Sequence, residues 1–153
     1  YGVGQHTYLT VGTERVDDVV LTVPANDWVR CDDRGLPIAI EPVAGTPYDF
    51  RSPRAIGDTQ LDTAYSALTR RADGRAVVTL ENEDGSSGLD VWLGYGADYL
   101  QVFSGDTLAV ERRRTGLAVE PMSCLPDAFN NGEGLVTLNA GETHTLRWGV
   151  APH

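Results

Sequence analysis

The stretch TGLAVEPMSCLPDAFN, residues 115–130, predicts a short apolar strand that ends in a carboxylate and runs into a loop. Successive side chains of a strand point to opposite faces, so Leu117 and Val119 share one face and Glu120 projects from the other. Because Pro121 has no N–H to donate, we expect strand pairing to stop at Glu120. A carboxylate at a strand end, beneath a loop, is partly desolvated, which raises its pKa toward the range of a useful base.

The local pattern leaves two interpretations of Glu120 open. One is a glutamate at the rim of a sheet that pairs with Arg112, Arg113 or Arg114, because ion pairs at strand ends are common and usually not catalytic. The other is a general base. The sequence around the strand does not decide between them.

Length and composition predict a single globular domain spanning residues 1–153, since a chain of this size can bury an ordinary core. The net charge is −10 and all twelve basic residues are arginine. An acidic surface repels phosphate backbones and anionic lipids, so we expect neither a nucleic-acid nor a membrane partner and favour a neutral ligand. No apolar run has the length of a membrane span or a signal peptide, and we expect a soluble, cytoplasmic protein.

The two cysteines, Cys31 and Cys124, lie far apart and in no metal-binding spacing. In the absence of a secretory segment, two reduced thiols are a better expectation than a disulfide bridge. No motif in the chain calls for a metal ion or an organic cofactor.

Many short, β-branched segments separated by Gly, Asp and Asn turns predict an all-β antiparallel sandwich. Trp92 and Trp148 are expected in its core, although an aromatic ring can also stack on a sugar. Residues 61–68 fit the spacing of a helix as well, but Thr63 and Tyr65 favour a strand. Strands are expected within residues 6–12, 16–23, 37–43 (an edge strand), 61–68, 76–80, 89–93, 99–103, 108–110, 116–120, 135–138 and 143–150.

Four segments resemble, in the same order, motifs of the aldose 1-epimerase (galactose mutarotase) family. The segment 116–121 with 126–130 is similar to that family's Gly-x-x-x-Glu-Pro strand and Pro-Asp-Ala-x-Asn loop. The other three segments are 100–106, which resembles Leu-Gln-Val-Tyr-Thr-Gly-Asn, 45–51, which resembles Gly-Thr-Pro-Phe-Asp-Phe-Arg, and 5–9, which resembles Asn-His-Ser-Tyr-Phe. Together they are spread over nearly the whole chain.

The resemblance implies a galactose-mutarotase-like β-sandwich (supersandwich), of which this chain is the C-terminal half. It also implies interconversion of the α and β anomers of an aldohexose such as glucose or galactose, without a cofactor. Glu120 is then the base, protonated His6 the acid, and Asp62 and Gln101 bind the sugar. Since acid and base must reach O1 and the ring oxygen, we expect Glu120 and His6 to face one cleft about one sugar ring apart.

Departures from the family pattern keep alternatives open. The family is about twice as long, and its N-terminal half supplies a histidine and an arginine that have no counterpart here. We therefore expect this chain to be a fragment that works with an N-terminal half, as a separate segment or chain, although 153 residues could also close their own sheets. His6 could be a surface histidine and Asp62 a turn aspartate. Alternative functions are a non-catalytic carbohydrate-binding sandwich and a sugar-phosphate epimerase, for which residues 112–114 are the sole arginine cluster available.

Overall fold

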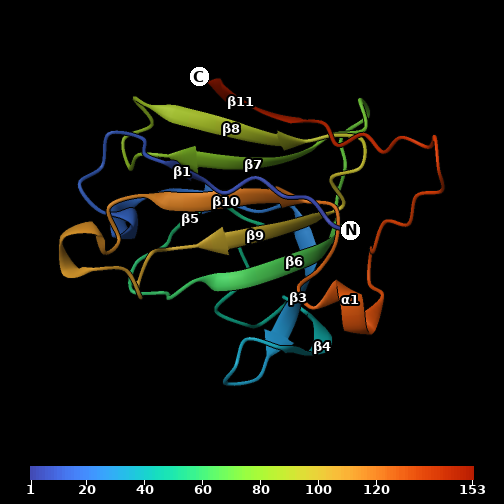
Figure 1. The fold of residues 1–153 in the computed structure, drawn as a ribbon. Coiled ribbons are helices and arrows are strands. Elements are labelled where there is room, and N and C mark those ends of the chain that lie inside the picture. Colours follow the sequence, from blue (N-terminus) through green and yellow to red (C-terminus); the bar gives the residue numbers. More distant parts are fainter.

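The computed structural model describes residues 1–153 and consists of two antiparallel sheets packed face to face (Figure 1). The six-stranded sheet has the order β1-β10-β9-β6-β3-β4, and the five-stranded sheet has the order β11-β8-β7-β2-β5. Neighbouring strands come from distant parts of the sequence, so the fold is held by long-range pairing. The prediction of an antiparallel β-sandwich is confirmed.

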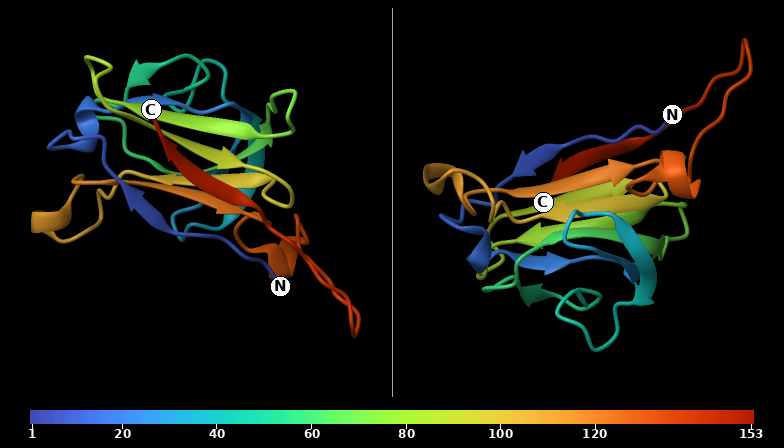
Figure 2. Two further views of the ribbon diagram at one scale, coloured as in Figure 1. Left: turned by 90° about the horizontal axis from the view of Figure 1, so that it is seen from above. Right: turned by 60° about the horizontal axis from the view of Figure 1, so that its bottom comes forward.

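The six-stranded sheet consists of β1 (Thr7–Leu9), β3 (Ala25–Cys31), β4 (Pro37–Pro42), β6 (Asp62–Leu68), β9 (Tyr99–Phe103) and β10 (Leu117–Met122). The five-stranded sheet consists of β2 (Val20–Thr22), β5 (Arg54–Ala55), β7 (Ala76–Glu81), β8 (Gly88–Leu93) and β11 (Trp148–Pro152). Helical structure is limited to α1 (Ala128–Asn131) and to 3-10 turns at Val16–Asp18 and Val110–Arg112. The segment between α1 and β11 makes an excursion away from the sheets (Figure 2).

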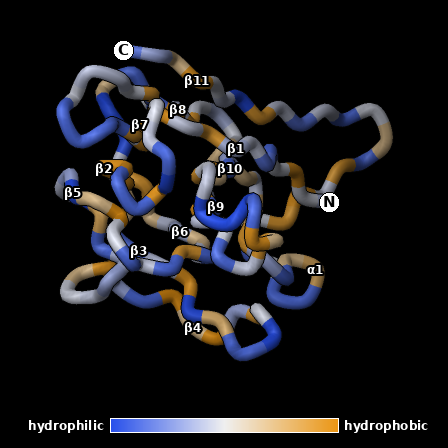
Figure 3. Tube along the Cα trace, turned by 90° about the vertical axis from the view of Figure 1, so that its left-hand side faces the viewer, coloured by the Kyte–Doolittle hydropathy of each residue, from blue (hydrophilic) through white to orange (hydrophobic).

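The core lies between the sheets and is built by period-two alternation. Leu117 and Val119 of β10 are buried there, together with Leu100 and Val102 of β9. Burying a side chain of this kind contributes about 1.5–3 kcal/mol. Apolar segments accordingly concentrate in the strands, and hydrophilic ones in the connecting loops (Figure 3). The predicted division of β10 into an apolar face and a face carrying Glu120 is therefore correct.

The opposite, outer face of the six-stranded sheet carries a second and smaller apolar cluster. Val29 of β3 and Ala64 of β6 are buried there beneath Leu125, which lies in the loop that follows β10. This loop therefore turns back over the outer face instead of leaving the sheet. The packing fixes one wall of a cleft on that face.

Several local predictions are confirmed. Residues 62–68 form a strand rather than a helix, and Gly74 takes a positive φ of 81° in the turn that leads to β7. The proline-bounded segment 37–42 is an edge strand of the six-stranded sheet. Cys31 and Cys124 are both free thiols.

Four strand predictions are wrong in part or in whole. Of residues 143–150, only 148–150 belong to a strand, β11. Only Val20–Thr22 of residues 16–23 is a strand, because Val16–Asp18 form a 3-10 turn. Residues 108–110 and 135–138 are not strands, and Val110 and Leu138 are exposed. An apolar run becomes a strand only where a neighbouring strand can pair with it, and these two runs have no such neighbour.

The expectation that Pro121 ends the strand is also wrong. Strand β10 continues to Met122, and Pro121 lies opposite Leu100 of β9. On its other side the Pro121 carbonyl accepts a hydrogen bond from the Gln5 N–H at 3.1 Å. Proline removes one donor from the ladder but keeps its acceptor, so pairing persists beyond it.

Neither predicted core tryptophan belongs to the core. Trp92 lies between the inward-facing Val91 and Leu93, so its ring is on the outer face of the five-stranded sheet. There the Arg75 guanidinium lies 4.4 Å from the ring centroid. Trp148 is half-buried on the edge strand β11. Alternation puts Trp92 on the outer face, whereas Trp148 lies opposite the inward Leu93 and stays half-buried because β11 is an edge strand.

Candidate active site

Strand register places two of the predicted site residues side by side on the outer face of the six-stranded sheet. Glu120 of β10 lies opposite Gln101 of β9, and Gln101 lies opposite Ala64 of β6. Residues directly opposite each other in an antiparallel pair point to the same face. The base predicted from β10 and the sugar-binding residue predicted from β9 therefore share one surface.

A second row of cross-strand neighbours lies two residues along the same strands. Tyr8 of β1 lies opposite Ala118, Ala118 lies opposite Phe103, and Phe103 lies opposite Asp62 at the beginning of β6. Asp62 is therefore diagonal to Gln101, and the two side chains meet. The Gln101 Nε2 amide donates a hydrogen bond of 2.6 Å to Asp62 Oδ1.

These rows border a hollow of about 470 Å³. Ala64 forms part of its floor, and Pro126 contributes from the loop above. A volume of this order is in the range of small-molecule sites. The hollow is lined by His6, Cys31, Gly35, Asp62, Ala64, Gln101, Phe103, Glu120, Met122 and Pro126, so all four predicted site residues line it.

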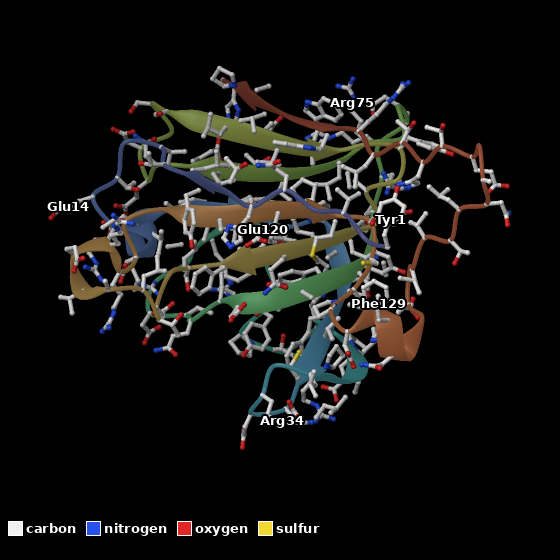
Figure 4. The ribbon with its side chains drawn as sticks, viewed as in Figure 1. Tyr1, Glu14, Arg34, Arg75, Glu120 and Phe129 are labelled. Atoms are coloured by element: carbon white, nitrogen blue, oxygen red, sulfur yellow. The ribbon has the colours of Figure 1, made fainter.

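Glu120 is the most shielded of the titratable groups in the hollow. Its side chain is 13% exposed, and Figure 4 shows it near the middle of the six-stranded sheet. Burial raises the pKa of Glu120 above its ordinary value, the charge of His6 opposes this rise, and the Asp62 carboxylate adds to it. Desolvation and a like charge thus make the carboxylate more basic, which suits a general base.

His6 comes to Glu120 from the edge strand. Its Nε2 lies 3.3 Å from Glu120 Oε1, and the His6 side chain is 55% exposed. The prediction that both groups face one cleft agrees with this geometry, but the expected separation of one sugar ring is wrong, because the two groups are in contact. The alternative that Glu120 pairs with a neighbouring arginine is also wrong, since Arg114 binds Asp17 and Asp106 instead.

Gln101 leaves one polar atom without a partner. Its Oε1 is buried and accepts no hydrogen bond, while its Nε2 is held by Asp62. Buried polar atoms in proteins are usually paired, so an unpaired amide oxygen in a hollow is an acceptor that a ligand hydroxyl can satisfy. This observation, together with Asp62 beside it, gives the hollow a polar wall suited to a polyhydroxy ligand.

Several side chains in or beside the hollow were not identified from the sequence as site residues, among them Tyr8 beside it and Phe103 and Cys31 in its lining. Tyr8 lies with its ring centroid 5.1 Å from that of His6, and its pKa is raised by burial and by the charges of Glu120 and Asp62. The Phe103 ring lies beside that of Tyr8, with centroids 6.4 Å apart, and Phe103 and Cys31 both line the hollow. Tyr8 could have been found from the sequence, because it lies two residues after His6 and so points the same way. Cys31 could not, because nothing local indicates that β3 lies near Asp62.

Two negative findings complete the description. No group of three or more His, Cys, Asp and Glu side chains is arranged to hold a metal ion. None of the helices is long and apolar enough to span a membrane. In addition, no arginine lines the hollow, so residues 112–114 do not provide the phosphate site that a sugar-phosphate substrate requires.

Comparison with known protein families agrees with this arrangement. A family model described as "Aldose 1-epimerase" matches residues 1–150. The chain belongs to the aldose 1-epimerase family. Among curated proteins of similar sequence, "Uncharacterized protein YihR" of Escherichia coli K12 is 33% identical over 150 residues, covering 98% of this chain and 46% of that protein.

Solved structures show the same aldose-epimerase fold. A galactose mutarotase-like protein from Clostridium acetobutylicum superposes with a TM-score of 0.79 at 14% identity, covering 99% of this chain and 47% of that one. A galactose 1-epimerase from Lactobacillus acidophilus gives 0.67 at 26% identity, covering 80% and 40%. The predicted galactose-mutarotase-like fold is thereby confirmed. The chain spans about half the length of these relatives.

Proposed function

We propose that this protein is an aldose 1-epimerase that interconverts the α and β anomers of an aldohexose such as glucose or galactose. The observation that carries the proposal is the contact between the shielded Glu120 and His6 in a sugar-sized hollow. Two titratable groups of opposite type, held in different environments, are what acid–base ring opening requires. Family membership supports the reaction class, and the hollow supports a ligand about the size of one sugar.

In the proposed mechanism, the Glu120 carboxylate removes the proton from the anomeric hydroxyl while protonated His6 gives its proton to the ring oxygen. The C1–O5 bond breaks, the open aldehyde rotates about C1–C2, and O5 attacks the other face of C1. On closure Glu120 returns a proton to O1 and His6 recovers its own from O5. The reaction needs no net proton, electron or co-reactant.

The ion-pair geometry has a consequence for substrate entry. At 3.3 Å apart, Glu120 and His6 leave no room for a sugar ring between them. The charge of His6 lowers the pKa of Glu120 against the effect of burial, and so favours the carboxylate form that can act as a base. We propose that the sugar displaces His6, which is the more exposed partner and precedes the short edge strand β1.

Asp62 and Gln101 are proposed to hold sugar hydroxyls. The carboxylate accepts hydrogen bonds, and the free Gln101 Oε1 accepts another, while the Gln101 amide keeps the two side chains at a fixed distance. A neutral, hydroxyl-rich ligand fits a site with acceptors and no arginine. Such a ligand is also compatible with a protein of net charge −10. We place the activity in the cytoplasm, where free aldoses are metabolised.

The complete activity is proposed to require the other half of the family fold, on the same polypeptide or on a separate one. Tyr8 and His6 are both largely exposed on the β1 side of the hollow. An acid–base site open to water on one side loses part of its electrostatic advantage. Relatives of about twice this length have additional chain, and we propose that it closes that side.

Polarimetry of freshly dissolved α-glucose or α-galactose tests the proposal in the complete protein. Glu120→Gln keeps the shape of the side chain and removes the base, so mutarotation should fall by about 10²- to 10⁴-fold. Glu41→Gln serves as the matched control, because Glu41 pairs with Arg30 and does not line the hollow. Wild-type acceleration in Glu120→Gln would refute the role of Glu120 as the base. If the wild type itself gave no acceleration, a non-catalytic carbohydrate-binding sandwich would be left as the function.

A further inference from the structure

Arg114 is a buried arginine for which the proposed chemistry has no use. It is 5% exposed and has a positive φ of 57°, which is uncommon for a residue with a side chain. Its guanidinium donates to five oxygen atoms: Asp17 Oδ2 at 3.0 Å, Asp106 Oδ1 and Oδ2 at 2.9 and 3.1 Å, and the carbonyls of Gly57 and Thr59 at 2.6 and 3.3 Å. The planar fork of an arginine can satisfy such a set, and a lysine cannot.

These contacts lead to the beginning of β6. The Ser104 hydroxyl, fully buried, donates to the Asp106 carboxylate that Arg114 holds. The same hydroxyl oxygen accepts the Leu61 N–H at 2.8 Å, and the Ser104 N–H donates to the Leu61 carbonyl at 2.9 Å. Ser104 therefore forms hydrogen bonds with both the N–H and the carbonyl of Leu61, the residue directly before Asp62.

We infer that Arg114, Asp106 and Ser104 form a positioning network that fixes the start of β6 and thereby holds the Asp62 carboxylate against Gln101 in the hollow. Asp62 is itself exposed and is held at its carboxylate by Gln101 alone among side chains. Its backbone position must therefore come from Leu61 before it and from Thr63 after it, which lies opposite Val102. The network supplies the first of these two anchors.

The role in catalysis rests on the proposed function, whereas the role in placing Asp62 does not. Arg114→Lys keeps the charge but loses the fork, and Asp106→Asn keeps the shape but weakens the acceptor. A shift of the carboxylate by about 1 Å can reduce kcat/KM by up to 100-fold. Since Asp62 is proposed to bind hydroxyls in ground and transition states alike, we expect the loss mainly in KM, with kcat nearly unchanged.

A double-mutant cycle with Asp62→Asn separates positioning from general stabilisation. If the network acts through Asp62, Arg114→Lys should change KM by less than about twofold in the Asp62→Asn background, although it raises KM at least tenfold in the wild type. Arg34→Lys is the control, because Arg34 is 76% exposed and pairs only with Asp32. Equal effects of Arg114→Lys in both backgrounds would overturn the inference.

A second readout does not depend on activity. The side-chain amide resonances of Gln101 report whether Asp62 Oδ1 remains its partner. We expect Arg114→Lys and Asp106→Asn to move these resonances toward their positions in Asp62→Asn, and Arg34→Lys to leave them unchanged. Unchanged Gln101 resonances in both network variants would also overturn the inference. A failure of the proposed function is recognised separately, because it would show as wild-type mutarotation in Glu120→Gln.

Discussion

Replacing the buried Arg114 by alanine should destabilise the protein far more than replacing an arginine at the surface. The substitution removes the cation that pairs with the Asp106 carboxylate, whose side chain is 18% exposed. It also removes the buried arginine that pairs with Asp17, whose side chain is 36% exposed. It also leaves the carbonyls of Gly57 and Thr59 without this donor. Breaking a buried ion pair from one side costs about 3–5 kcal/mol.

Alanine pays the same backbone cost for the positive φ at position 114. The difference in unfolding free energy between the wild type and Arg114→Ala therefore measures the contribution of the side chain alone. For a domain of this size, about 3–5 kcal/mol corresponds to a fall in Tm of roughly 10–15 °C. Thermal and urea unfolding, followed by circular dichroism, measure it. The control is Arg34→Ala, for which a change within about 0.5 kcal/mol is expected because that ion pair is largely solvated.

A loss in Arg114→Ala below about 1 kcal/mol would mean that the pair is screened like a surface pair, and the reasoning from burial would fail. High salt provides an independent check. Salt screens exposed charges much more than buried ones. In 1 M salt the difference in unfolding free energy between the wild type and Arg114→Ala should therefore narrow only slightly.

Three further outcomes follow from the hollow. Burial raises the pKa of Glu120, so between the ordinary and the raised pKa the folded state binds more protons than the unfolded state. The free energy of unfolding therefore falls as pH rises through that window. Glu120→Gln should abolish this fall and be more stable than the wild type at pH 7, as measured by urea titration. His6→Gln removes the charge that lowers the pKa of Glu120, so the acidic limb of the residual pH–rate profile should move to higher pH. Burial and the charges of Asp62 and Asp32 raise the pKa of Cys31 above its ordinary value. Iodoacetamide should therefore label Cys31 slowly at neutral pH and faster at alkaline pH, and galactose should slow the labelling.

The sequence predicts the parts of this site that depend on local alternation. Leu117 and Val119 face inward and Glu120 outward because the period of a strand is two, and the same rule puts Gln101 beside the inward Leu100 and Val102. Which strands lie side by side in the sheet could not be predicted from this alternation. The contact of Asp62 with Gln101 requires β6 to pair with β9 in one register, and pairing partners separated by tens of residues leave no local signal.

Arg112, Arg113 and Arg114 show a second limit of sequence patterns. Three consecutive arginines are typical of a solvated segment, and the first two are indeed exposed. The 3-10 turn Val110–Arg112 and the positive φ at Arg114 turn the third side chain inward, where it pairs with Asp17 and Asp106. The partners lie 97 and 8 residues away, so neither spacing nor charge pattern identifies the pair.

Strand β10 carries stability on one face and the proposed chemistry on the other. Its inward residues Leu117 and Val119 bury apolar area, which stabilises the fold, whereas the outward Glu120 is partly desolvated beside Asp62, which costs stability. Functional sites commonly carry such a cost. Because a slip of one residue would exchange the two faces, the core packing of β10 also fixes where the base points. Substitutions at Val119 should therefore lower stability first, and substitutions at Glu120 should lower activity while stability rises.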